Sequence, residues 1–230
     1  MTPSHILRTV AALLTVAAAA ACGATGGAGQ GVQTSSEPAI AHGEVSAIAK
    51  ARRDSARYPY TAADVHFMSA MISHHAQAIV MAGWAPTHDA SGSVRTLAAR
   101  IINAQQDEIA TMQTWLRDRQ QSVPEARPTG MKMVMNGVEH EMLMPGMLTE
   151  DQMKQLDQAR GKEFDRLFLT FMIQHHRGAV SMVKDLFGSY GAGQDETVFK
   201  FASDVNVDQS TEIERMEKML TALRTESRSP

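Results

Sequence analysis

The stretch "DVHFMSAMISHHAQAIVMA", residues 64–82, decides the fold because the chain contains it in two versions. Residues 165–183, "DRLFLTFMIQHHRGAVSMV", align with it without gaps at a shift of 101 residues. A second segment, "LAARIINAQQDEIATM" at 97–112, recurs in the same order as "FASDVNVDQSTEIERM" at 201–216. Two segments that repeat in the same order indicate an internal duplication.

Both repeated segments have the periodicity of a helix. In the first, apolar residues follow steps of four and three from Phe67 to Met81, on a face that includes His74. The same spacing predicts that Ser73 and Gln77 lie on the opposite side. Turn-forming residues at 83–93, "GWAPTHDASGS", and at 187–194, "FGSYGAGQ", separate the two helices of each repeat. We therefore expect two helical hairpins that close an all-α four-helix bundle.

The composition divides the chain into further parts. Residues 1–22 combine a basic start at Arg8, a short apolar run and small residues before Cys22, which predicts a lipoprotein-type signal peptide with lipidation of Cys22. The alternative is ordinary cleavage after an alanine, which would leave a free cysteine. Residues 23–60 are expected to be a flexible tether. The bundle covers 61–224, with repeat one at 61–121, a methionine-rich linker at 122–148 and repeat two at 149–224.

The linker holds soft donor atoms where no core requires them. Methionines alternate at the start of the segment, which suits an extended piece or a short hairpin around Asn136 and Gly137. A capping box of Thr149 and Gln152 follows. The linker's candidate metal ligands are Met131, Met133, Met135, Met142, Met144, Met147 and His140.

The helices offer a second set of candidate ligands. If the bundle has the two-fold symmetry that a duplication implies, the pairs His74/His75 and His175/His176 meet across the core. The candidates that flank them are Met71, Met81, Met172, Met182, Asp64 and Asp165. Imidazole with thioether selects copper over zinc or magnesium, so we expect a copper-binding protein. For the helical methionines taken alone, packing in the core is the simpler role.

Two other functions stay open. Glu108 and Glu212 occupy matching places in the second helices, and with the histidines they could form a di-metal redox site that holds iron, which would make the chain an enzyme. The Glu-x-x-His pair typical of such sites is absent, however, and the glutamates could instead orient the imidazoles. The histidines could also be a purely structural network inside a helical module.

The charge and the motifs exclude several classes. A net charge of -3 gives no reason to expect nucleic acid as a partner, or a membrane other than through a lipid anchor. No nucleophile with a matching base and no glycine-rich phosphate loop is evident, so a hydrolase or a nucleotide-dependent enzyme is not expected. Exposed methionine would permit a homodimer.

The motifs together resemble one known family. The duplicated F-x-x-x-M-I-x-H-H core, "MPGML" at 144–148 and "GKEFDRLFLTFMIQHHRGAVSM" at 161–182 are similar to the bacterial domain-of-unknown-function 305 family, DUF305. The resemblance implies a ferritin-like bundle, export to the cell envelope and, as in some exported relatives, copper binding. It marks the aspartates, methionines and histidines of both helical repeats, together with Met144 and Met147, as family positions.

Overall fold

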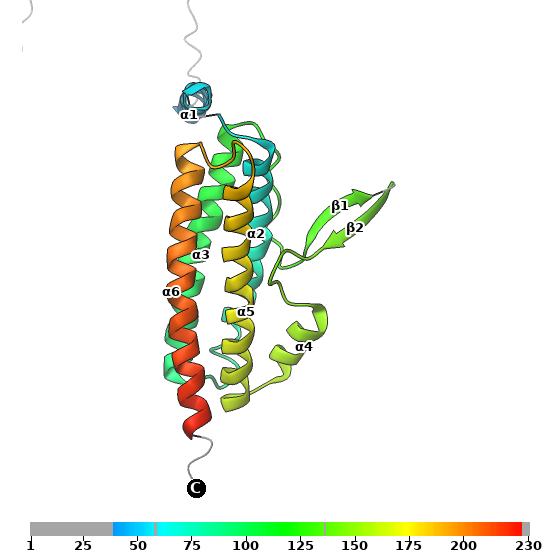
Figure 1. Cartoon of the computed structure of the whole chain (residues 1–230), viewed down its shortest axis with the longest axis vertical. Coiled ribbons are helices and arrows are strands. Elements are labelled where there is room, and N and C mark those ends of the chain that lie inside the picture. Colours follow the sequence, from blue (N-terminus) through cyan, green and yellow to red (C-terminus); the bar gives the residue numbers. More distant parts are fainter. Residues whose placement is uncertain (1–38, 58, 136, 227–230) are drawn as a thin grey trace, which may run out of the picture. The chain divides into compact units, whose positions relative to one another are not determined.

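Four long helices form the body of the protein (Figure 1). The computed structural model describes residues 39–57, 59–135 and 137–226. Helix α2 (Ala62–Gly83) packs chiefly on α3 (Gly92–Asp118), and α5 (Gly161–Gly188) packs on α6 (Glu196–Glu226). The two hairpins meet mainly where α2 contacts α5. The all-α bundle of two helical hairpins is confirmed.

Local sequence signals fix the helix ends. Thr61 and Asp64 form a capping box at the start of α2, and Ser91 caps α3 by accepting a hydrogen bond from Val94 N. The predicted capping box of Thr149 and Gln152 is present. It opens a separate nine-residue helix, α4 (Glu150–Gln158), rather than α5 itself.

Helix α2 is buried almost all round. Its residues contribute to both apolar clusters of the bundle, which between them contain the large side chains Met71, Leu116, Phe164 and Phe168. Gln77 is only 1% exposed. The side opposite the apolar stripe, where Ser73 and Gln77 were predicted to lie, is thus also buried, and the chain segment before α4 covers Gln77 there.

The linker forms a β-hairpin. Strand β1 (Met131–Met135) pairs antiparallel with β2 (Val138–Met142), around a turn in which Gly137 has a φ of 79°. This confirms the expected hairpin.

The described residues also contain a helix that the sequence did not indicate. Helix α1 (Ala39–Arg57) lies within the segment 23–60 that was expected to be a flexible tether. The rest of the tether up to residue 38, the expected signal peptide and Cys22 lie outside the described residues. Between Ala39 and Glu226, no helix has the length and apolar character that a membrane span requires.

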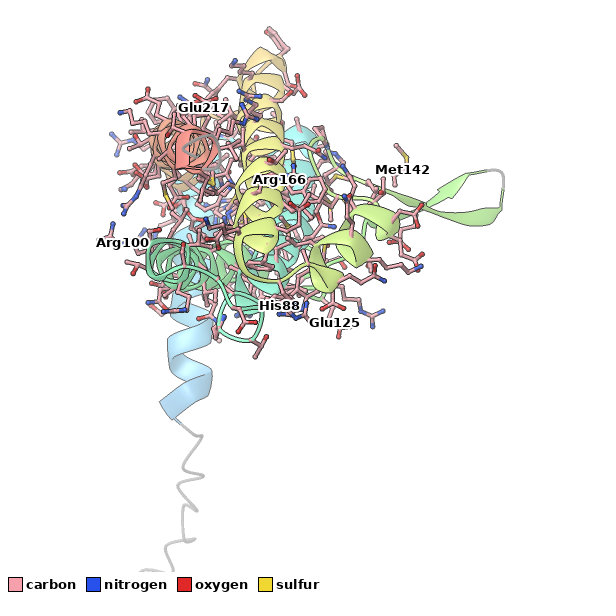
Figure 2. The ribbon with its side chains drawn as sticks, turned by 90° about the horizontal axis from the view of Figure 1, so that it is seen from below. His88, Arg100, Glu125, Met142, Arg166 and Glu217 are labelled. Carbon is pink, nitrogen blue, oxygen red and sulfur yellow. The ribbon has the colours of Figure 1, made fainter. Side chains whose placement is uncertain are left out.

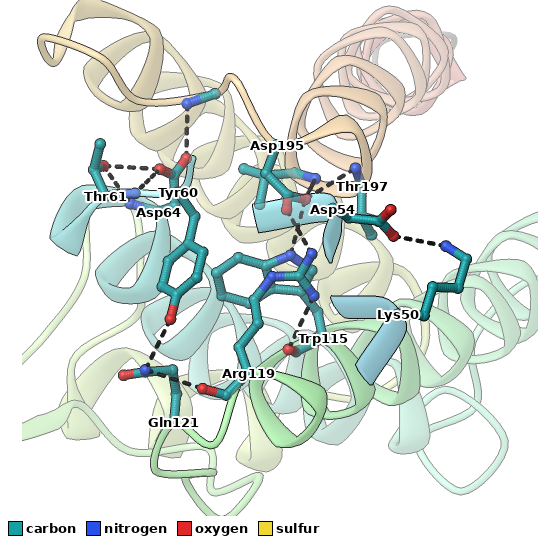
Figure 3. A network of polar contacts seen from close by, with 12 residues as sticks. Lys50, Asp54, Tyr60, Thr61, Asp64, Trp115, Arg119, Gln121, Asp195 and Thr197 are labelled. Carbon is teal, nitrogen blue, oxygen red and sulfur yellow. Dashed lines mark hydrogen bonds and ion pairs between the residues drawn. The ribbon is translucent and has the colours of Figure 1, made fainter. Parts of the chain in front are cut away.

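A network of polar side chains ties the hairpins together near one end of the bundle (Figure 3). Asp195 accepts hydrogen bonds from Trp115 Nε1 at 3.0 Å and from the backbone amides of Thr197 and Val198, and it also pairs with Arg119. One carboxylate thus caps α6 and joins it to α3.

Candidate metal site

Four imidazoles meet in the middle of the bundle. His74, His75, His175 and His176 are all fully buried. The rings of His74 and His175 lie 3.8 Å apart between centroids, at 41°. Within each helix the neighbouring rings are 6.3 and 6.2 Å apart, at 56° and 55°, so the two repeats have nearly the same geometry. The structure brings the histidines together across α2 and α5, as the duplication predicts.

The hydrogen bonds of two imidazoles leave a ring nitrogen free. His74 Nε2 lies 3.0 Å from the carbonyl oxygen of Pro145, and His176 Nε2 lies 2.7 Å from Glu212 Oε2. Because a carbonyl or carboxylate oxygen accepts, each Nε2 carries the proton and each Nδ1 keeps its lone pair. Both Nδ1 atoms are buried without a partner. Ligating histidines are typically held in this way, by a hydrogen bond from the other nitrogen.

The other two imidazoles are less constrained. His75 Nε2 lies 2.8 Å from Glu108 Oε2, a close contact that is not aligned as a hydrogen bond. Neither ring nitrogen of His175 has a hydrogen-bond partner. Buried polar atoms without partners are costly and rare in folded proteins. The concentration of such atoms in one place indicates a binding site for another group, such as a metal ion.

Burial keeps the central pair neutral. Desolvation lowers the pKa of His74 to about 3, with a further contribution from the charge of His75. Desolvation and the neighbouring His74 hold the pKa of His175 well below its ordinary value. A neutral imidazole is the form that binds a metal ion.

The "MPGML" segment closes the site on the side of α2 and α5. Besides the contact of Pro145 with His74, Leu148 N donates to Gln77 Oε1 at 2.7 Å, and Gln77 Nε2 donates to Leu148 O at 3.0 Å. In the second repeat the position equivalent to Gln77 is Gly178, where an added Cβ would lie 1.9 Å from Pro145 O. The segment is therefore anchored by a glutamine on one helix and accommodated by a glycine on the other.

The helical methionines fall into two groups. Met71, Met81 and Met172 are fully buried among apolar side chains, in agreement with a packing role. Met182 is instead at the edge of a cavity of about 200 Å³, beside Met144 of the "MPGML" segment.

His66 lines this same cavity and was not among the predicted ligands. The second repeat has Leu167 at the equivalent position, so the repeat pattern itself gave no signal for His66. One imidazole and the two thioethers of Met144 and Met182 thus border one opening.

The aspartates have another role. Asp64 accepts hydrogen bonds from Thr61 N at 2.6 Å and from Gly193 N at 2.7 Å, and Asp165 accepts from Ser91 N at 3.1 Å. Each lies ten residues before the first histidine of its helix, which corresponds to about 15 Å along the axis. We therefore leave Asp64 and Asp165 out of the proposed metal site.

The linker candidates gather on the hairpin. The register pairs Met131 with Met142 and Met133 with His140. Met147 is separate from them and is buried in a core cluster with Met144.

The histidine site is not a preformed carboxylate cage. Among the residues that the structure describes, no three His, Cys, Asp or Glu side chains are gathered into a group that could hold a metal ion. Glu108 contacts Nε2 of His75, and Glu212 contacts Nε2 of His176. These contacts suit the role of orienting the imidazoles, which the sequence also suggested for the two glutamates. Imidazole nitrogens suit copper as well as zinc, iron and nickel, and these few nitrogens fit an ion bound by few ligands better than a di-iron centre.

Fold and site together define a helical-bundle protein with paired histidines in its core. The chain belongs to the DUF305 family, the domain of unknown function whose sequence pattern matches residues 64–220. Comparison with curated proteins gives no match.

Solved structures of the same family are similar to the chain. A DUF305 fragment from Deinococcus radiodurans is 28% identical, with a TM-score of 0.59, over 71% of this chain and 99% of the other. A DUF305 protein from Streptomyces coelicolor, described as secreted, is 29% identical, with a TM-score of 0.57, over 70% and 92%.

CopM in its Cu(II)-bound form is 28% identical, with a TM-score of 0.54, over 69% of this chain and 96% of CopM. CopM also has Cu(I)-bound and silver-bound structures. Relatives that share this fold therefore include one that binds copper and silver.

Proposed function

We propose that this protein binds copper ions in the cell envelope, for sequestration or for transfer to another carrier. The observation that carries the proposal is the cluster of four buried imidazoles with unpartnered ring nitrogens between α2 and α5. His74 and His175, which are neutral and adjacent, are the principal ligands we propose, with His75 and His176 beside them. The copper-bound and silver-bound structures of CopM support the choice of metal.

Softer donors nearby support Cu(I) in particular. The proposed secondary sites are the cavity edge with His66, Met144 and Met182, and the β-hairpin. The candidate ligands of the hairpin are Met131, Met133, Met135, His140 and Met142. Thioether sulfur prefers Cu(I) and Ag(I) to Zn(II). A protein with both a buried imidazole site and outer thioether sites could collect ions at its surface and retain them inside.

The proposal also includes the location of the protein in the cell. The first 22 residues have the pattern of a lipoprotein-type signal, and a DUF305 neighbour is described as secreted. We propose an envelope location with lipidation at Cys22. Mass spectrometry of the protein from a membrane fraction tests this, because a diacylated Cys22 would support the anchor and an unmodified alanine-cleaved form would refute it.

The central experiment is an anaerobic titration of the purified protein with Cu(I) against a chromophoric chelator. Two variants separate the sites. One is His74→Gln/His175→Gln, and the other changes Met131, Met133, Met135 and Met142 to leucine. Met153→Leu/Met219→Leu, on α4 and α6 and outside the proposed sites, is the control for loss of thioethers.

The proposal predicts that the tightest binding is lost in the histidine variant and kept in the hairpin variant and the control. Tight binding kept by the histidine variant but lost from the hairpin variant would place copper at the hairpin. No Cu(I) binding by the unaltered protein would refute the copper function, and iron that copurifies with it would favour the redox enzyme. Circular dichroism establishes that each variant is folded.

A further inference from the structure

The side of the bundle formed by α3 and α6 is hollowed. A cavity of about 290 Å³ lies there, bordered by Glu108 and Gln105 from α3 and by Asp208, Gln209 and Glu212 from α6. A second cavity of about 600 Å³ shares Glu108 and Asp208 with it. In Figure 2, Arg100 of α3, which borders the first cavity, is labelled on this side of the bundle. We call the two neighbouring cavities the α3–α6 trough.

The trough is acidic. Its basic residues are Lys50, Arg100, Lys200 and Arg215, and its carboxylates are Asp107, Glu108, Glu196, Asp204, Asp208 and Glu212. Carboxylates therefore outnumber cations. Burial and the nearby carboxylates Glu108, Asp204 and Glu212 raise the pKa of Asp208, a further sign that negative charge is crowded there. A trough of this charge attracts cations rather than anions.

Two glutamines inside the trough lack partners. Gln105 and Gln209 are 2% and 3% exposed, and they occupy equivalent positions in the two repeats. Gln105 Oε1 and both amide atoms of Gln209 have no hydrogen-bond partner, although both residues line the cavity. An amide oxygen buried without a partner is destabilising on its own, and its partial negative charge attracts a passing cation.

The trough is one residue away from the histidines. Glu108 borders it and contacts His75, and Glu212 borders it and contacts His176. On the opposite side, the segment with Pro145 covers His74. The trough therefore offers an ion a route toward the imidazoles that does not displace the "MPGML" segment.

We propose that the α3–α6 trough is the port through which copper ions enter and leave the histidine site. Its carboxylates concentrate the cation, and the amide dipoles of Gln105 and Gln209 stabilise its charge on the way to His75 and His176. The inference rests on the proposed copper function, and it concerns the rate of loading rather than the final affinity.

A rate measurement tests the port. The protein is mixed with a cationic Cu(I)–acetonitrile complex, and a chromophoric chelator traps the unbound Cu(I) after variable delays. Ala104→Phe obstructs the cavity, and Gln105→Leu/Gln209→Leu removes the amides at nearly constant volume. The matched control is Ala99→Phe, an exposed position on the same helix that does not line the trough.

We expect both trough variants to load at least about tenfold more slowly than the control, with unchanged stoichiometry at equilibrium. The loading rate of the unaltered protein should also fall as salt is added. Equal rates in all variants, with normal final binding, would refute the port and leave the copper function intact. An unaltered protein that takes up no Cu(I) at its histidines would refute the proposed function itself.

Discussion

At the scale of single residues, the site depends on which ring nitrogen of each histidine is occupied. His176 is held by Glu212 and His74 by a backbone carbonyl, so in both cases Nδ1 remains available. Neighbouring groups, rather than the histidines alone, thus determine the ligand atoms. The sequence identified the histidines and the two glutamates, but it could not assign tautomers because these depend on contacts across helices.

The carboxylate behind His176 can be tested by one substitution. Glu212→Gln keeps the shape but weakens the acceptor for the Nε2 proton, so we expect Cu(I) affinity to fall by about 10–100-fold. Competition titration with a chelator measures the change. Glu217→Gln on the same helix, whose carboxylate pairs with exposed Arg177, should leave the affinity unchanged. Equal effects of the two substitutions would contradict the orienting role of Glu212.

The neutral histidines predict how stability depends on pH. Because the pKa of His74 is about 3 in the folded state and near 6.5 in the unfolded state, the unfolded chain binds more protons between these values. The free energy of unfolding should therefore be highest above pH 6.5 and fall below it, by up to about 1.4 kcal/mol per pH unit for each such histidine.

Urea unfolding of the metal-free protein from pH 7 to pH 5 measures this slope. His74→Gln should show a shallower slope than the unaltered protein, since one of the groups that resist protonation is gone. Identical slopes would show that His74 is not kept neutral by the fold.

At the scale of elements, the "MPGML" segment links the linker to the helices. It rests on α5 only because position 178 lacks a side chain, and it is fixed to α2 by Gln77. The sequence indicated the helices and the hairpin through periodicity and turn residues. It did not indicate that Gln77 is buried, because a polar residue opposite an apolar stripe looks the same whether water or another chain segment covers it.

Gly178→Ala should displace this segment. The new Cβ would meet the backbone of Pro145, which cannot move without loss of the contact with His74, so we expect a destabilisation of about 1–3 kcal/mol. Thermal and urea unfolding measure it. Gly188→Ala, at the end of the same helix with open space around it, is the matched control and should be neutral or stabilising. Equal stability of the two variants would show that the "MPGML" segment can move away from α5 without a cost in stability.

At the scale of the whole molecule, the duplication produces reciprocal ties between the hairpins. Asp64 of the first hairpin accepts the amide of Gly193 in the turn of the second, and Asp165 of the second accepts the amide of Ser91 in the turn of the first. The repeat marked both aspartates as candidate functional residues. Because each carboxylate recurs near a pair of histidines, the sequence suggested that it was a metal ligand. The distance to the histidines along the helix and the hydrogen bonds to turn amides instead indicate that it ties the two hairpins together.

Asp64→Asn and Asp165→Asn should therefore each lower the free energy of unfolding by about 1.5–3 kcal/mol, since each replaces a charged acceptor of backbone amides. The number of Cu(I) ions bound by the folded protein should not change. Chemical unfolding and a copper titration on the same samples check both parts. A lost ion with unchanged stability would restore the aspartates as ligands.

The covalent fusion of two similar halves has a consequence for the innermost ring pair. Two identical subunits related by an exact dyad would present His74 and His175 in the same surroundings. Here a single "MPGML" segment bonds to His74, while His175 has both nitrogens free. The duplication therefore produces two central imidazoles with unequal surroundings, one that is hydrogen-bonded to the "MPGML" backbone and one that is not.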